Sequence, residues 1–184
     1  MSIRKSIMFV SVLSITGILT SVSTFAASSN LALKKPATAS SSYNEDSNPS
    51  RANDGKYETD NSVGKFWSTA DGKSANSWWS VDLGEKCRLS EVKLKFRKIG
   101  NYRFIPGSIA ILVSDDNKNW TVALPKSTTT LPAVGAPYSE ELSSFPVSAS
   151  GRYVKLLFED KTADSEYDCV QLVEVEVLGE VLPK

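Results

Sequence analysis

The residues best suited to chemistry lie in one polar segment, SRANDGKYETDNS, at positions 50–62. Its Asp-Gly pair predicts a tight turn, because glycine reaches backbone conformations that other residues avoid. The side chains around that turn that carry oxygen are Asp54, Glu58, Thr59, Asp60 and Ser62. Calcium takes several oxygen ligands from carboxylates, hydroxyls and backbone carbonyls. The segment is therefore a candidate calcium loop, although its spacing alone fits an ordinary polar turn equally well.

Catalytic groups are scarce in this chain. Histidine is absent from all 184 residues, which removes the usual general base, the usual zinc ligand and any histidine triad. The segments SVGK and SEVK match a loose Ser-x-x-Lys pattern, but Ser90 of the second is expected to begin a strand. The sequence has no Gly-x-Ser-x-Gly motif, phosphate loop or Cys-x-x-Cys pair. We therefore predict a binding protein and not an enzyme.

Charge and the N-terminal residues indicate where the protein acts. The 21 basic and 21 acidic residues cancel, so no surface for nucleic acid or anionic membrane is predicted. Arg4 and Lys5 precede an apolar run that ends in small residues, which is typical of a secretory signal peptide cleaved after Ala26. We expect residues 1–26 to be the signal, residues 27–184 to form one domain, and the mature protein to be secreted and extracellular.

Short runs of alternating apolar and polar residues fill the rest of the chain. They are WWSVDL, EVKLKFR, SIAILVS, NWTVAL, RYVKLLFE and VEVEV, with residues typical of turns between them. In the last run, Val173, Val175 and Val177 are expected on one face, with Glu174 and Glu176 on the other. A period of two without a convincing helical period predicts an all-β sandwich or barrel.

Six segments, taken in order, resemble discoidin-type domains, also called coagulation-factor C-type or galactose-binding-like domains. The segments are NLALKKPATASSSY, RANDGKYET, NSWWSVDLGE, VSDDNKNW, GRYVKLLFE and VEVEVLG. They run from Asn30 to Gly179, and the family includes fucose-binding lectins and bacterial carbohydrate-binding modules. The resemblance implies a jelly-roll-like antiparallel β-sandwich with ligand loops gathered at one end. It also implies that Trp78 and Trp79 are packing residues, with Trp79 on the core side and Trp78 under a loop.

The resemblance implies a structural calcium ion as cofactor. In the lectin members this ion ties the loop after the first strand to the start of the last strand. The matching positions are the carboxylates of Asp54 and Glu174, the carbonyls of Arg51, Lys56 and Val173, and the hydroxyl of either Thr59 or Ser62. The competing interpretation is that Glu174 lies on the solvent face of an alternating strand.

The resemblance also implies a glycan ligand that is galactose- or fucose-like. Arg97 and Arg103 match the arginines of the fucose-binding members, and a guanidinium fork suits neighbouring sugar hydroxyls. Lys65 is nearest to the position of a histidine that those lectins use and this chain lacks, so the specificity stays open. Trp67 and Tyr167 are candidate apolar walls of the site. The alternative for both arginines is an ordinary exposed charge at the end of a strand.

A second function competes with the lectin-like one. Discoidin-type domains also bind phospholipid surfaces or protein partners through apolar loop tips. Here the segment KIGNYRFIPG offers Ile99, Tyr102, Phe104 and Ile105 for that role. The sequence favours a secreted carbohydrate-binding domain with structural calcium and keeps the adhesion domain as the alternative. It makes no prediction of oligomeric state.

The two cysteines, Cys87 and Cys169, raise the question of a disulfide. An even number in a secreted chain favours a bond. The expected topology puts the two residues at opposite ends of a strand, and a strand of about eight residues rises about 26 Å. A disulfide needs Cα atoms within about 7 Å. We therefore predict that the cysteines are unpaired.

Overall fold

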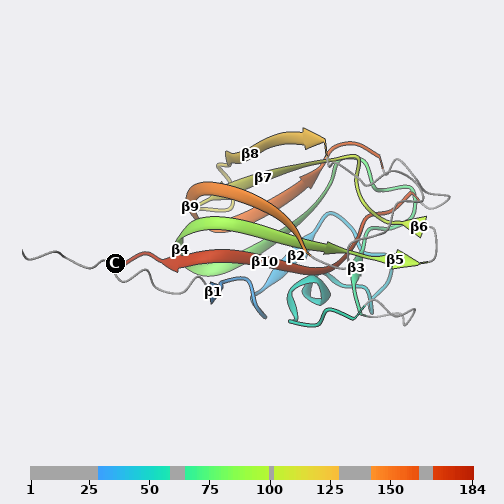
Figure 1. Ribbon diagram of the computed structural model, residues 1–184, viewed down its shortest axis with the longest axis horizontal. Coiled ribbons are helices and arrows are strands. Elements are labelled where there is room, and N and C mark those ends of the chain that lie inside the picture. Colours follow the sequence, from blue (N-terminus) through green and yellow to red (C-terminus); the bar gives the residue numbers. More distant parts are fainter. Residues whose placement is uncertain (1–28, 59–64, 100–101, 129–141, 162–167) are drawn as a thin grey trace, which may run out of the picture.

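The fold is built from antiparallel strands in two layers (Figure 1). The computed structural model describes residues 29–58, 65–99, 102–128, 142–161 and 168–184, so the predicted signal peptide lies outside it. The elements are β1 (Ser29–Asn30), β2 (Ala37–Ala39), the 3-10 helix η1 (Pro49–Asn53), β3 (Trp67–Ser68), β4 (Ser77–Phe96), β5 (Lys98–Ile99), β6 (Tyr102–Arg103), β7 (Ser108–Ser114), β8 (Thr121–Thr128), β9 (Ser143–Phe158) and β10 (Gln171–Val181). Strand pairing follows the order β1-β10-β4-β9-β7-β8, with β2 beside β4 and β3 beside β10. The predicted all-β sandwich is confirmed.

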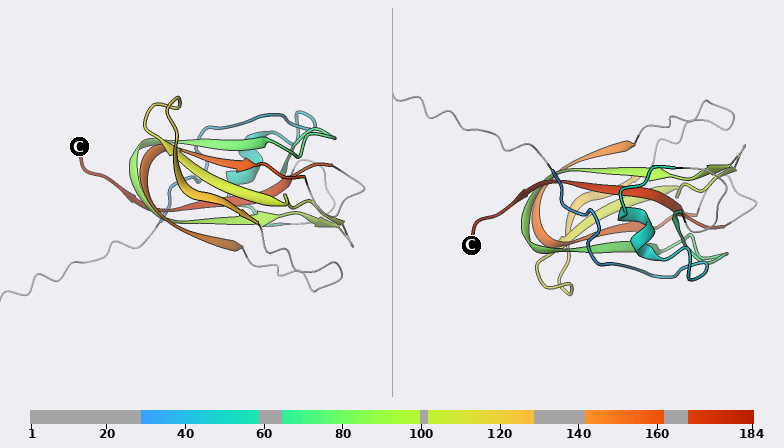
Figure 2. Two further views of the ribbon diagram at one scale, coloured as in Figure 1. Left: turned by 90° about the horizontal axis from the view of Figure 1, so that it is seen from above. Right: turned by 90° about the horizontal axis from the view of Figure 1, so that it is seen from below.

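Two long strands pass through both layers. In one layer, the first half of β4 pairs with the second half of β9, and β2 and β7 lie beside them. In the other layer, the second half of β4 pairs with the first half of β9, and β10 lies beside β4. The pairing is interrupted between Asp82 and Cys87, where Gly84 has a φ of 87° that favours glycine. Figure 2 shows both strands turning there, which closes one end of the sandwich. The loops that carry the predicted site residues therefore lie at the other, open end.

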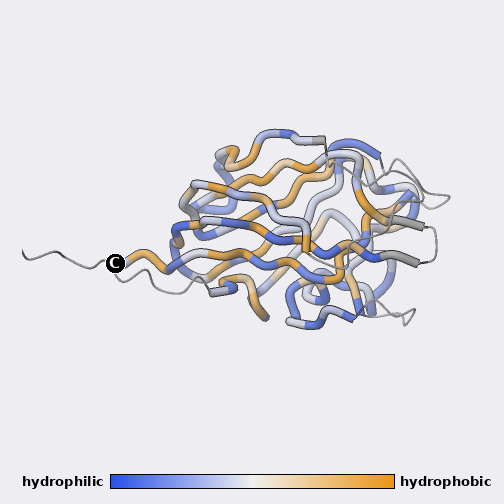
Figure 3. Tube along the Cα trace, in the orientation of Figure 1, coloured by the Kyte–Doolittle hydropathy of each residue, from blue (hydrophilic) through white to orange (hydrophobic). Residues whose placement is uncertain are grey.

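The core lies between the two layers. Alternation predicts its members correctly on β4, where Trp79, Val81 and Leu83 are buried and Trp78 is half-buried on the outer face. The same alternation of apolar and polar residues is visible along the strands in Figure 3. The indole of Trp79 donates to the backbone oxygen of Pro49 at 2.9 Å, so the core also anchors η1. The assignment of Trp79 to the core is therefore confirmed.

The short helix η1 fixes the position of the polar segment that contains the candidate calcium loop. Asn48 caps η1 by accepting a hydrogen bond from the Ser50 amide at 3.2 Å, and Pro49 occupies the first helical position. The buried Asn53 amide donates to the backbone oxygens of Ala32 at 2.6 Å and Lys35 at 2.9 Å. These bonds fix the helix against the N-terminal segment. Within the described ranges, no helix is long and apolar enough to cross a membrane.

Both cysteines are buried and unpaired, as predicted. Cys87 lies at the closed end, opposite Gly151 and Val181. Cys169 lies two residues before β10, at the open end. Burial raises the pKa of both thiols, which keeps them protonated and poorly nucleophilic.

We predict that Gly179→Ala strongly destabilises the fold. Gly179 lies at a register shift in the pairing of β10 with β4, and a Cβ added there would overlap the carbonyl oxygen of Arg88. Because backbone and not a flexible side chain must yield, we expect the free energy of unfolding to fall by about 3 kcal/mol. Urea denaturation measures it. Glu180→Ala is the control, and losing its exposed ion pair with Arg88 should cost less than about 1 kcal/mol. An unchanged midpoint for Gly179→Ala would contradict this close approach of β10 to β4.

Candidate functional site

The candidate site begins with an irregularity in β10. The register shifts between Leu172 and Glu174, which makes Val173 the extra residue of a β-bulge. Leu172, Val175 and Val177 therefore face the core, and Val173 is buried outside it. The expectation that all three valines share one face is wrong, because the bulge breaks the alternation.

Glu174 lies on the face of β10 opposite Val175 and Val177, where the turn after η1 covers it. Its side chain is 0% exposed, which overturns the interpretation of Glu174 as a solvent-facing residue. Its Oε2 accepts a hydrogen bond from the Gly55 amide at 3.1 Å, and Gly55 has a φ of 84° that suits glycine. Its Oε1 has no hydrogen-bond partner among the described residues. One oxygen of this carboxylate is thus satisfied and the other is not.

The electrostatics around Glu174 disfavour its charged form. Burial raises its pKa to about 8, and the neighbouring charges of Asp54 and Glu176 act in the same direction. A buried carboxylate beside a second carboxylate is costly unless a positive charge accompanies it. Asp54 is half-buried, and its Oδ1 accepts the Lys56 amide at 3.0 Å. An unsatisfied buried oxygen beside a second carboxylate fits a hard divalent cation with oxygen ligands.

The other predicted metal ligands divide into two groups. Arg51 lies in η1, Lys56 in the turn after it and Val173 in the bulge, and only their backbone oxygens were expected to act. The Arg51 side chain is engaged elsewhere, since its Nε donates to the Asp46 oxygen at 3.2 Å. Thr59 and Ser62 lie outside the described residues, so the choice between them stays a prediction. In the part of the chain that the structure describes, no three carboxylate or thiol side chains gather as a metal cluster.

Acidic residues continue along β10 next to the same turn. The Tyr57 hydroxyl donates to the Glu176 carboxylate, and burial together with this bond raises the pKa of Tyr57. The turn after η1 is therefore joined to β10 at Glu174 and again at Glu176. Sequence reasoning missed Tyr57, whose contact depends on the position of η1.

Arg97 lies at the same end, directly after β4. It is 7% exposed, and its guanidinium carbon lies 4.0 Å from the ring centre of Phe66 and 5.9 Å from that of Phe104. Its Nη1 donates to Gln171 Oε1 at 3.0 Å. A guanidinium between two rings with an amide partner is attracted by the rings and oriented by the hydrogen bond. The interpretation of Arg97 as an ordinary exposed charge is therefore wrong.

The remaining predicted sugar residues fare differently. Lys65 is half-buried and immediately precedes Phe66 in the chain. Trp67 is 0% exposed, stacks on Phe158 at 6.2 Å, and donates from its indole to the Ser41 oxygen at 3.0 Å. Because a sugar must reach the ring it packs on, we correct the assignment of Trp67 from sugar wall to core. The Arg103 side chain and Tyr167 lie outside the described residues.

The apolar residues that suggested a membrane-binding tip are partly buried in the fold. Phe104 is buried against Arg97, and Ile105 belongs to the hydrophobic core. The side chains of Ile99 and Tyr102 lie outside the described residues. Two of the four residues are therefore not available to insert into a lipid surface. Sequence reasoning missed that Phe66, Phe104 and Gln171 surround Arg97, because nothing in the local pattern joins three separate segments.

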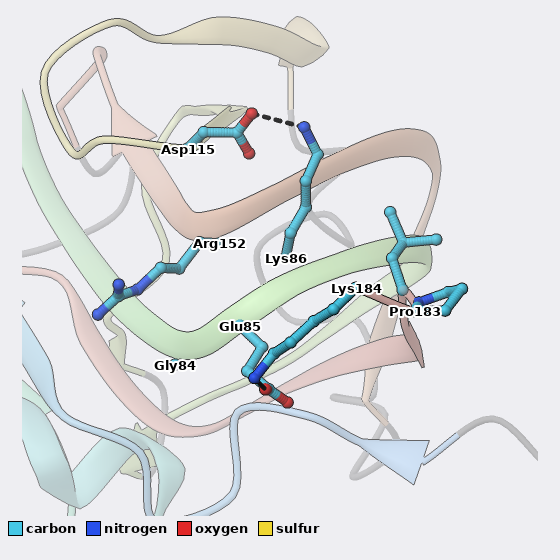
Figure 4. A pocket seen from close by; sticks show the side chains of 8 residues that line it. Gly84, Glu85, Lys86, Asp115, Arg152, Pro183 and Lys184 are labelled. Atoms are coloured by element: carbon cyan, nitrogen blue, oxygen red, sulfur yellow. Dashed lines mark hydrogen bonds and ion pairs between the residues drawn. The ribbon is translucent and has the colours of Figure 1, made fainter.

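The closed end carries a hollow of about 600 Å³, drawn in Figure 4. Lys86 reaches Asp115 across it at 2.6 Å, and Lys184 reaches Glu85 at 3.1 Å. These pairs are exposed and weak. None of the predicted ligand residues lies there, so we place the candidate site at the open end.

Solved structures of carbohydrate-binding proteins are similar to this chain. A chitosan-binding module of a chitosanase/glucanase from Paenibacillus sp. IK-5 is 28% identical, with a TM-score of 0.61, over 82% of this chain and 98% of that one. A fucose-binding module from Streptococcus pneumoniae is 26% identical, with a TM-score of 0.60, over 82% and 95%. A fucolectin from striped bass (Morone saxatilis) is 24% identical, with a TM-score of 0.63, over 85% and 50%, and shows the shared fold.

The chain can be assigned to a family because a family model matches most of the domain. No curated protein matches the chain. The model of the F5/8 type C domain matches residues 36–175, which include both carboxylates of the candidate metal site and Arg97. The fold is the galactose-binding-like sandwich of lectins and carbohydrate-binding modules. The chain belongs to the F5/8 type C, or discoidin, domain family.

Proposed function

We propose that this protein is a secreted, non-enzymatic carbohydrate-binding domain whose glycan site lies at the open end, around Arg97. The observation that supports this proposal most directly is that Phe66, Phe104 and Gln171 orient the Arg97 guanidinium. A planar donor held in one orientation loses little freedom when it bonds to sugar hydroxyls. The chitosan-binding and fucose-binding modules that resemble this chain support a glycan as the ligand. The signal-like residues 1–26 support secretion.

A structural calcium ion at Asp54 and Glu174 is the second part of the proposal. The unsatisfied Glu174 oxygen and the raised pKa of that carboxylate support it, because a cation would meet both needs. The ion would take both carboxylates and backbone oxygens of the turn. It would strengthen the link between the turn after η1 and β10, which the Gly55 bond to Glu174 already makes. β10 also carries Gln171, so the ion would steady the strand that orients Arg97.

The calcium site predicts a specific dependence of stability on pH. The pKa of an unfolded glutamate is about 4.3, whereas that of folded Glu174 is about 8. Between these values the folded state holds a proton that the unfolded state has lost, so stability in chelator should fall as pH rises from 5 to 8. Calcium competes with that proton and should restore stability at pH 8 more than at pH 5. At free calcium 100-fold above Kd, the gain is about 2.7 kcal/mol.

Melting temperatures in chelator and in calcium, across this pH range, test the prediction. Glu174→Gln should lose the calcium response together with this part of the pH dependence, because a glutamine has no proton to lose. Asp54→Ala should lose the calcium response and keep a pH dependence in chelator. Glu180→Gln, at the exposed end of the same strand, should behave like the wild type. If the wild-type protein melts at the same temperature in chelator and calcium at pH 8, the calcium site is not there.

The glycan site predicts that Arg97→Lys weakens sugar binding at least about tenfold, because it removes a charge-assisted donor fork. A monosaccharide of about a dozen heavy atoms should bind at about millimolar Kd. Titrations with fucose, galactose and chitotriose, followed by amide NMR shifts, measure it. Arg88→Lys, in an exposed ion pair on the same strand, is the matched control. Equal affinity of Arg97→Lys and wild type would move the site elsewhere on the domain.

A further inference from the structure

The outer face of the layer that contains β7 and β8 carries a lysine with no acidic partner. Lys155 of β9 lies opposite Ser80 of β4 on one side and Leu112 of β7 on the other. Its Nζ lies 3.9 Å from the ring centre of Trp120 and 4.9 Å from that of Trp78. The ammonium is therefore held between two half-buried indoles in the middle of the sheet face.

The charge of Lys155 is not balanced by the residues that the structure describes. Some lysines of the described ranges, such as Lys86, Lys126, Lys161 and Lys184, pair with carboxylates. Lys155 makes no such pair within the described ranges, and burial alone lowers its pKa. Packing of its aliphatic stem on the indoles explains where the side chain lies. It does not supply acceptors for the ammonium.

A small polar groove lies on the same sheet face, and its lining includes sheet neighbours of Lys155 but not Lys155 itself. It has a volume of about 250 Å³ and is lined by Pro36, Thr38, Ser80, Asp82, Asn117 and Tyr153, among others. Ser80 and Tyr153 are also the immediate neighbours of Lys155 on the sheet face. The turn that carries Asn117 is held by Asp116, which accepts the amides of two later residues at 2.9 and 2.8 Å. The groove therefore has defined walls.

The charges around the groove leave it favourable for an anion. The Asp82 carboxylate accepts hydrogen bonds from Nε and Nη2 of Arg152, both at 2.7 Å, so its negative charge is already compensated. Arg152 also lies over the ring of Tyr153 at 5.0 Å. The Lys155 ammonium, by contrast, has no ion-pair partner within the described ranges and contacts only the two indole rings.

We propose that this groove is a second ligand site, which binds an acidic sugar and pairs its carboxylate with Lys155. Hydroxyls of the sugar would bond to Thr38, Asn117 and Tyr153, and its apolar face would meet the half-buried ring of Tyr153. The volume is below the range of about 300–1,000 Å³ typical of drug-sized sites, which suits a single pyranose unit. This site goes beyond the proposed function, because it lies on the sheet face and shares no residue with the open end.

The experiment compares acidic and neutral probes on the intact domain. Trigalacturonate and 3′-sialyllactose carry the carboxylate, lactose lacks it, and a six-residue glutamate peptide carries carboxylates without a sugar. Calorimetry in chelator and at low salt, well below the melting temperature, removes calcium from the measurement. We expect the wild type to bind one of the acidic sugars at least about tenfold more tightly than lactose and than the peptide.

Three variants separate charge from packing. Lys155→Met keeps the stem against the indoles and should weaken binding of the acidic sugar at least about tenfold. Lys155→Arg keeps the charge and should bind it. Lys126→Met, on β8 two strands away and ion-paired with Asp160, should bind like the wild type. Amide NMR shifts on binding should centre on Ser80, Asn117 and Tyr153.

Four outcomes would overturn the second site. They are equal affinity for acidic and neutral sugars, no binding of either acidic sugar at millimolar concentration, unchanged binding by Lys155→Met, and equal binding of the glutamate peptide. The last would make the face a site for acidic protein segments. Binding of trigalacturonate would identify the ligand as a uronate, and binding of 3′-sialyllactose would identify it as a sialate. Failure here is distinct from failure of the open-end site, which Arg97→Lys tests with neutral sugars.

Discussion

The passage of β4 and β9 through both layers is the constraint on which the rest of this structure depends. Because these two strands make the turn at one end, that end is closed by continuous backbone. The separate loops and short strands must then meet at the other end. The turn after η1 completes the arrangement, since it covers β10 beside the bulge at Val173 and contacts Glu174 there. A rigid sandwich thus presents its irregular segments together, as ligand-binding loops usually require.

Three buried or half-buried charges mark what this sandwich can bind. Glu174 is buried with one oxygen unsatisfied, Arg97 lies between two phenylalanines, and Lys155 lies between two tryptophans. Each is placed on or next to a strand, so its position is set by the sheet and not by a loop. Charges held in this way contribute little to stability, because their desolvation is costly. We propose that their value lies in ligand recognition, since their orientation is fixed before a ligand arrives.

The candidate site was only partly visible in the sequence. The segment RANDG and the final VEVEV run were enough to pair Asp54 with Glu174, and the resemblance to discoidin-type domains supplied the reason. The sequence could not show that Glu174 is buried, because alternation puts it opposite the core valines and the turn after η1 covers that face only in the folded chain. Trp67 was placed in the site for a similar reason. Local pattern does not reveal that its indole packs on Phe158 from a distant strand.

The sequence by itself determined the class of fold, the core face of most strands and the free state of the cysteines. These follow from a period of two and from the sequence order of the strands, and neither needs long-range contacts to be known. Tertiary structure decided the environment of each charge. Arg97 meets Phe66, Phe104 and Gln171, and Lys155 meets Trp78 and Trp120, only after separate strands align. Burial and pairing of a charge depend on residues far away in the chain, so no local pattern encodes them.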